Sequence, residues 1–285
     1  MWIGVAIIEF CCTIVLSFAA LLFILFIIKQ KTLKALWQDS PPLLCFFIAT
    51  FVLANTNLIA ILQWLLVALN VIAMVPENLL FLHFVTIFSM CMKLFYNCST
   101  AGIFLQRIYF LCFPLNSIKL LNRGIVALNL LIPPILGLAF IYYNIASILK
   151  GIPPIDKGCY SFNCMPTYNQ YLRQFGNLVE LIFSVIIIIL GTWLQILLYQ
   201  FKTHFQTSND VKINRFMGYL FYLRIVLETA PTILDMILIN MAGKSLGMYI
   251  GPYGSMGTAI DMFICTLAYF VLTRKRKESV SVIPL

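Results

Sequence analysis

The sequence predicts an all-α membrane protein built as a bundle of seven transmembrane helices. Hydrophobic residues make up 62% of the chain and charged residues only 10%, against roughly a quarter charged residues in soluble domains. The hydrophobic residues lie in seven long runs, and short polar segments between the runs hold most of the basic residues. A soluble fold cannot bury that much apolar surface, whereas the hydrocarbon of a bilayer is itself an apolar solvent.

Each hydrophobic run is longer than the roughly 20 residues that a helix needs to cross about 30 Å of hydrocarbon. The runs lie near residues 3–28, 43–66, 79–106, 125–148, 175–199, 216–241 and 249–272. Helices are expected because backbone that faces lipid must satisfy its own hydrogen bonds. Residues 1–285 are therefore expected to form one seven-helix domain, in which 273–285 is a short basic tail.

The first three runs have recognisable ends. The apolar core of run 3–28 is far longer than the roughly 7–15 residues of a secretory signal, and its lysines follow it, so we expect it to remain as the first span. Pro41 and Pro42 open the second run, since proline is tolerated in the first turn of a helix. The third run ends at Arg107.

Turn-forming segments separate the remaining runs. Residues 150–174 are polar and rich in glycine and proline, and two glycines loosen the connection before the seventh run. Pro133 and Pro134 lie inside the fourth run and Pro231 inside the sixth. Prolines at such positions kink membrane helices but are tolerated, because neighbouring groups satisfy the freed carbonyls.

The basic residues predict the orientation. Thirteen Lys and Arg residues fall on one side of the predicted spans and four on the other. The thirteen are Lys29, Lys31, Lys34, Arg107, Lys119, Arg123, Lys202, Lys212, Arg215, Arg274, Lys275, Arg276 and Lys277. Because cytoplasmic loops are enriched in Lys and Arg, the C-terminus is expected in the cytoplasm and, with seven spans, the N-terminus outside.

A short motif follows the third run. Arg107 stands at the expected cytoplasmic end, Tyr109 follows it two residues later, and Pro114 lies seven residues after Arg107. An arginine at that place can pair inside the bundle at rest and turn toward a partner when the helices shift. The open alternative is an ordinary basic residue whose side chain extends to the lipid headgroups.

With seven spans and an outer N-terminus, this motif resembles that of G-protein-coupled receptors. Gln106 replaces the acidic residue that usually precedes the arginine, and Tyr109 is shifted by one position. The pattern is most similar to the divergent nematode serpentine chemoreceptors, and residues 158–164 resemble those of class BC serpentine receptors. The resemblance implies a chemosensory receptor in the plasma membrane, in sensory neurons, that detects a small-molecule ligand and signals through a heterotrimeric G protein. Arg107, Tyr109 and Pro114 would then serve coupling and activation.

Cys159 and Cys164 lie in the polar segment that is predicted to face outside. The oxidising compartment favours a small disulfide ring across the four residues between them. Two free thiols are the alternative.

Charged residues also lie inside the predicted spans, where they are rare and usually face the bundle interior. Arg224, Glu228 and Asp235 fall within a stripe about 40° wide if the sixth helix is regular. Lys93 and Asp261 lie near the middle of the third and seventh runs. Together these residues predict a ligand pocket or an activation switch, with buried structural ion pairs as the alternative. Arg224 and Glu228 are one turn apart and can pair without a ligand. We also expect Lys93 and Asp261 to couple across helices.

Other function classes fit less well. A net charge of +9 would by itself favour a nucleic-acid partner, but the basic residues lie in short clusters at the ends of the apolar runs, so the partner expected is the lipid bilayer. Two isolated histidines supply neither a metal site nor an enzyme centre, so we expect no enzyme activity and no cofactor. The main alternative is a small transporter or channel, which would also carry intramembrane charge. The sequence lacks the repeated halves typical of transporters.

Overall fold

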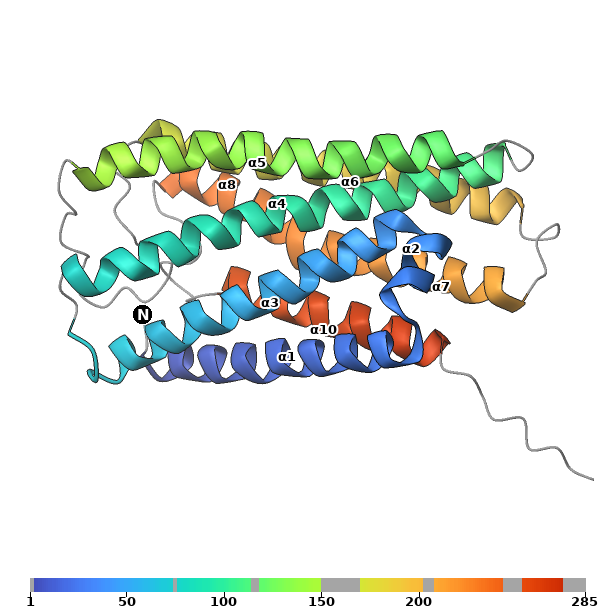
Figure 1. Ribbon diagram of the computed structural model, residues 1–285. Helices are drawn as coiled ribbons and strands as arrows, with labels where there is room; N and C mark the ends of the chain where they lie inside the picture. The colour runs from blue at the N-terminus through green and yellow to red at the C-terminus, as the bar shows by residue number, and fades with distance from the viewer. Residues whose placement is uncertain are drawn as a thin grey trace, which may run out of the picture.

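The computed structural model describes residues 3–73, 76–113, 118–149, 170–201, 208–242 and 253–273. Within these ranges the chain is helical and contains no strand. The long helices lie side by side along one direction, with α1 and α10 packed together at one edge and α5 at the other (Figure 1). Their bounds are Ile3–Gln30 (α1), Pro41–Ala68 (α3), Pro76–Cys112 (α4), Lys119–Leu149 (α5), Gln170–Gln200 (α6) and Tyr253–Thr273 (α10).

The sixth expected span is a helix in three parts. These are α7 (Ser208–Arg224), a π-helical turn η2 (Ile225–Thr229) and α8 (Ala230–Ala242). Each of the seven hydrophobic runs therefore coincides with helix within the described part of the chain. Among the described residues, five helices, α1, α3, α5, α6 and α10, contain a segment that is long and apolar enough to cross a membrane by length and composition. Helix α4 carries Lys93, Asn97 and Arg107, and the sixth segment is divided into three parts.

A short helix that the hydrophobic runs do not predict, α2 (Leu33–Asp39), joins α1 to α3. Thr32 caps its start by accepting a hydrogen bond from the Ala35 amide at 3.3 Å. Ser40 ends α2 and caps α3, because its hydroxyl accepts a bond from the Leu43 amide at 3.4 Å. Leu36 is fully buried and fastens α2 to the bundle. A serine or threonine before a helix is the usual N-terminal cap.

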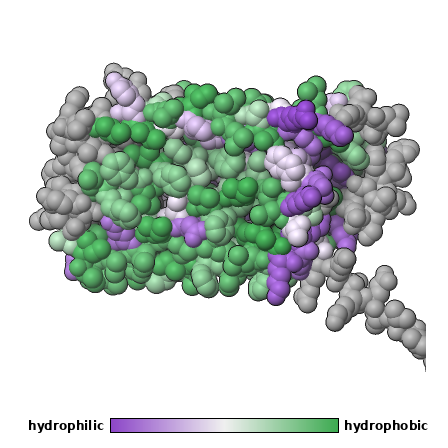
Figure 2. All heavy atoms as spheres, viewed as in Figure 1, coloured by the Kyte–Doolittle hydropathy of each residue, from purple (hydrophilic) through white to green (hydrophobic). Residues whose placement is uncertain are grey.

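The outer surface of the bundle is largely apolar, unlike that of a soluble protein. Large apolar side chains point outward along the helices, among them Ile8 and Leu138, each 64% exposed. Hydrophobic side chains cover most of the face drawn in Figure 2, and hydrophilic ones gather at the end where α2 and the start of α7 lie. Charged side chains such as Arg224 and Asp261 are buried instead. This distribution is the one expected when the surrounding medium is lipid.

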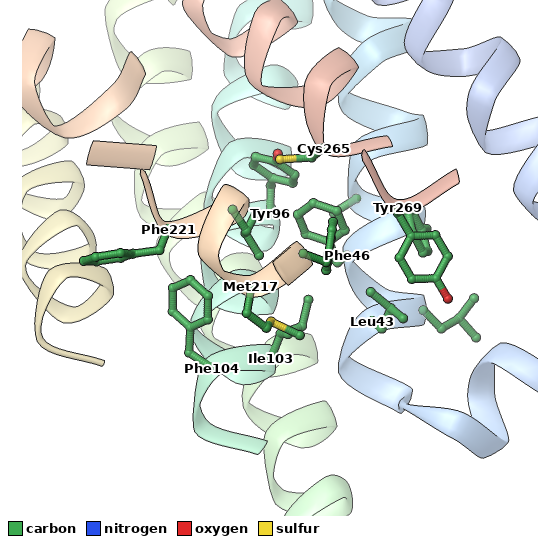
Figure 3. Packing of buried hydrophobic residues seen from close by; sticks show 14 of the residues in the cluster. Leu43, Phe46, Tyr96, Ile103, Phe104, Met217, Phe221, Cys265 and Tyr269 are labelled. Atoms are coloured by element: carbon green, nitrogen blue, oxygen red, sulfur yellow. The ribbon is translucent and has the colours of Figure 1, made fainter. Parts of the chain in front are cut away.

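The largest core cluster lies where α3, α4, α7 and α10 meet (Figure 3). Tyr96 on α4 stacks on Phe46 of α3 with ring centroids 4.9 Å apart. Gly191 of α6 lets Phe221 of α7 approach, because a Cβ at this glycine would lie 2.1 Å from the Phe221 ring. Small residues allow this kind of close helix packing in membranes.

The π turn η2 lies directly before Pro231. Proline has no amide hydrogen, so Pro231 cannot bond to the carbonyl of Leu227 four residues earlier. The Ala230 amide bonds instead to the carbonyl of Ile225, five residues earlier. The Leu227 carbonyl lies against α10, where a Cβ on Gly257 would be only 3.0 Å from its oxygen. Helix α5, by contrast, continues without interruption through Pro133 and Pro134.

Candidate functional site

Nine polar side chains from four helical segments meet inside the bundle, and we call them the central network. They are Lys93, Tyr96, Asn97 and Thr100 of α4, Glu180 of α6, Arg224 and Glu228 of the divided sixth helix, and Asp261 and Cys265 of α10. The four α4 residues follow the spacing of one helix face. The two later pairs are each one turn apart, so each pair also shares a face.

Arg224 lies at the centre of this network and is only 1% exposed. Its Nη1 donates to Asn97 Oδ1 at 2.7 Å and to the Glu228 carboxylate. Its Nη2 donates to Thr100 Oγ1 at 2.9 Å. Its Nε lies 3.1 Å from Asp261 Oδ2, so one planar guanidinium joins α4, η2 and α10, a task that its forked donors suit.

Tyr96 and Asp261 complete the buried side of the network. The guanidinium of Arg224 lies over the Tyr96 ring, 3.9 Å from its centroid. The Tyr96 hydroxyl donates to Asp261 Oδ2 at 2.8 Å, and Cys265 Sγ donates to Oδ1 at 3.4 Å. Figure 3 shows Tyr96 and Cys265 facing each other between α4 and α10. Asp261 therefore has a partner on each oxygen, as a buried carboxylate requires.

The other side of the network is more accessible. Lys93 Nζ lies 3.1 Å from Glu180 Oε1 and 3.7 Å from Glu228 Oε1. The side chains of Lys93 and Glu180 are 24% and 28% exposed, and that of Glu228 is 14% exposed. Asn97 Nδ2 also donates to Glu228, at 3.2 Å. Exposure thus falls from Glu180 to Arg224, and Glu228 connects the two sides.

The structure shows which of the expected intramembrane pairs are present. The Arg224–Glu228 pair is present. Lys93 and Asp261 were expected to couple, but the structure gives them different ion-pair partners. Lys93 pairs with Glu180 and Glu228, while Asp261 pairs with Arg224. Glu180 was not predicted as a site residue, because it lies in the outer third of its hydrophobic run, where a carboxylate can reach water. A lone carboxylate in a long apolar run was the signal that could have marked it.

Asp235 is half-buried on α8 and hydrogen-bonds to Tyr253 at the start of α10. The stripe drawn through Arg224, Glu228 and Asp235 assumed a regular helix. Glu228 lies within the π turn, which changes the register of the residues that follow it.

A second polar cluster, the Arg107 cluster, lies near the C-terminal end of α4. Arg107 is 9% exposed. Its Nε and Nη2 both donate to Asn214 Oδ1 of α7, at 3.1 and 2.9 Å. Its guanidinium also lies over the Phe110 ring, 4.9 Å from the centroid. The side chain therefore pairs inside the bundle, which favours the first of the two interpretations drawn from the sequence.

Gln106 links the Arg107 cluster to two further helices. Ser40 at the start of α3 donates to Gln106 Oε1 at 2.5 Å, and Gln106 Nε2 donates to Asn122 of α5 at 2.8 Å. An acidic residue would have no N–H to offer Asn122. Tyr109 packs against Phe113 with ring centroids 5.2 Å apart.

Other expected site residues are not placed. Pro114, Cys159 and Cys164 lie outside the described residues. Among the described residues no group of three His, Cys, Asp or Glu side chains converges on a point where a metal ion would fit.

Comparisons with protein-family models, with curated proteins and with solved structures find no match for this chain. Its function must therefore be inferred from the two clusters themselves.

Proposed function

We propose that this protein is a seven-transmembrane chemosensory receptor. It detects a small molecule at the accessible side of the central network and signals through a heterotrimeric G protein. The N-terminus lies outside and the C-terminus in the cytoplasm, as the distribution of basic residues favours. On the resemblance to serpentine receptors, it is a multi-pass protein of the plasma membrane in sensory neurons. No reaction chemistry is required.

One observation carries the proposal: both polar clusters connect the same two helices. Arg224 at the end of α7 bonds to Asn97 and Thr100 of α4. Asn214, ten residues earlier on α7, bonds to Arg107 of α4. Ten residues of helix span about 15 Å. A helix that is fixed to the same neighbour at two depths can transmit a displacement from one contact to the other.

The proposed mechanism has two states. Without ligand, the central network holds α7 against α4 and Asn214 holds Arg107 within the bundle. A ligand that binds near Lys93 and Glu180 changes the pairing of Lys93 with Glu228. Glu228 is also paired with Arg224, which makes the deeper contacts. The sixth helix then shifts at its π turn, and Arg107 leaves Asn214 to meet the G protein. The ligand acts by its higher affinity for the second arrangement.

Topology and coupling can be tested in one experiment. Both termini are tagged, cells are stained with and without permeabilisation, and G-protein activation is measured for wild type, Arg107→Ala and Arg123→Ala. Arg123 is exposed on α5 at the same end of the bundle, so its loss is a matched control. An outer N-terminus, an inner C-terminus and activation lost only in Arg107→Ala are expected. Termini on the same side would mean an even number of spans and would overturn the proposal.

A transporter or channel is the second candidate, because a half-accessible ion-pair network inside the bundle would also suit a solute path. Uptake of solute into cells that express the protein, without activation of any G protein, would favour it.

A further inference from the structure

The central network contains more negative than positive charge. Its two cations, Lys93 and Arg224, face the three carboxylates of Glu180, Glu228 and Asp261. The other described members, Tyr96, Asn97, Thr100 and Cys265, are neutral. With all five charged groups ionised, one negative charge is left over within the described part of the network. An uncompensated charge is costly inside a membrane protein, so this site favours an additional cation.

The three carboxylates differ in exposure and in the number of their polar partners. Arg224 is enclosed between Glu228 and Asp261, whose side chains are 14% and 3% exposed. Glu180 has only Lys93 as its ion-pair partner among the described residues, through Oε1, and Lys93 is shared with Glu228. Among the described residues Glu180 therefore has the fewest polar partners of the three carboxylates and the greatest exposure, and an incoming group can reach it without displacing Arg224.

A tyrosine that is hydrogen-bonded to a further carboxylate lies within electrostatic range of Glu180. Tyr253 at the start of α10 hydrogen-bonds to Asp235 and interacts electrostatically with Glu180. Tyr253 and Asp235 are both half-buried. Carboxylates around an aromatic ring suit a positively charged nitrogen, because the ring face attracts cations as well.

From this arrangement we infer that the ligand is a cationic amine whose ammonium group binds to Glu180, beside Lys93 and the Asp235–Tyr253 pair. The inference rests on the proposed receptor function and adds the charge class of its ligand. A carboxylate or phosphate ligand is disfavoured, because it would add to the negative charge already in excess. Lys93 illustrates the chemistry, since an ammonium of the protein itself already lies between Glu180 and Glu228.

A chemical-rescue experiment tests whether this place accepts a cation from solution. Lys93→Ala removes a propylammonium group, so n-propylammonium chloride replaces the missing atoms. Thermal unfolding of the purified full chain in detergent is followed at matched ionic strength. The variant is expected to unfold at a lower temperature than wild type and to recover at least half of that difference with n-propylammonium. Recovery with n-propanol to the same extent, or no recovery with n-propylammonium, would overturn the inference.

A second measurement uses wild type and so does not depend on how the lysine variant folds. The probes are 2-phenylethylamine, the neutral 2-phenylethanol and the anionic 3-phenylpropionate. We expect a saturable rise in melting temperature of about 3 °C with the amine alone. Glu180→Gln should abolish this rise, while Glu9→Gln, the same change on α1, should keep it. Equal effects of the three probes, or an amine effect that persists in Glu180→Gln, would contradict an ammonium site at Glu180.

These experiments measure binding and not signalling, so the amine site and the receptor function can fail separately. Amine binding at Glu180 in a protein that activates no G protein would leave the site standing and remove the receptor. Arg107-dependent signalling by neutral or anionic ligands, with no amine bound, would support the receptor function and remove the amine site.

Discussion

The two polar clusters of this bundle use different chemistry to connect the same pair of helices. The central network joins α4 to the sixth helix through the Lys93–Glu228 ion pair and through the buried guanidinium of Arg224, which is also paired with the Glu228 and Asp261 carboxylates. In the Arg107 cluster, Arg107 of α4 donates two hydrogen bonds to the neutral amide of Asn214. A buried ion pair is costly to break because a charge is left behind, whereas an arginine that leaves an amide at the end of a helix can be solvated. The difference suggests that the central network fixes the packing and that the Arg107 cluster is the contact that opens.

The largest effect is expected from Arg224→Met, which removes the cation from between two buried carboxylates. The loss should destabilise the folded protein by about 3–5 kcal/mol. Thermal unfolding in detergent and the amount of protein at the cell surface measure it. Arg123→Met, on an exposed position of α5, is the control. A variant Arg224→Met as stable as this control would mean that the central network does not hold the bundle together.

Gly257→Ala tests the contact between the π turn and α10. Its new Cβ would lie 3.0 Å from the Leu227 carbonyl oxygen, and backbone moves less readily than a flexible side chain. We expect a loss of about 1–3 kcal/mol, as for other overpacked sites. Gly254→Ala on the same helix has nothing within 4 Å of its Cβ and should be close to wild type in the same unfolding assay. Equal melting temperatures for the two variants would rule out this close approach.

Asn214→Ala removes the amide that holds Arg107. The expected loss is about 1–2 kcal/mol, since Arg107 is charged but lies where solvent can replace the bond. Compared by thermal unfolding, Asn214→Ala should fall well short of Arg224→Met. If both variants lose the same stability, the proposed division between a fixed and an opening contact is wrong.

Tyr96→Phe gives the smallest expected effect, about 1 kcal/mol. The change removes the hydroxyl that donates to Asp261 but keeps the ring under Arg224 and against Phe46. Tyr222→Phe, at a position 61% exposed, serves as the control for thermal unfolding. A loss larger than that of Gly257→Ala would show that the hydroxyl, and not the ring, carries most of the Tyr96 contribution.

Hydrophobic runs were enough to predict where the long helices lie, because lipid and helix length constrain them strongly. They missed α2, whose signals are the caps Thr32 and Ser40 and not apolar length. They also did not predict the π turn, which depends on how Pro231 and the close approach to Gly257 are accommodated together.

The candidate site was predictable only in part. Arg224 and Glu228 could be paired from sequence because helix geometry places them one turn apart. The pairing of Lys93 with Glu180 depends on how α4 and α6 are rotated toward each other, and a single sequence contains no information on that rotation. Asn214 gave no signal of its own, because a polar residue at a helix end is expected to face water.

Guanine-nucleotide exchange on a purified G protein, with this protein in a lipid nanodisc, tests the central claim most directly. Asn214→Ala, wild type and Arg107→Ala would be compared without ligand. If Asn214 holds Arg107 away from the G protein, exchange should be several-fold faster with Asn214→Ala than with wild type, and slowest with Arg107→Ala. Equal exchange rates for all three proteins would contradict the claim that release of Arg107 couples this bundle to a G protein.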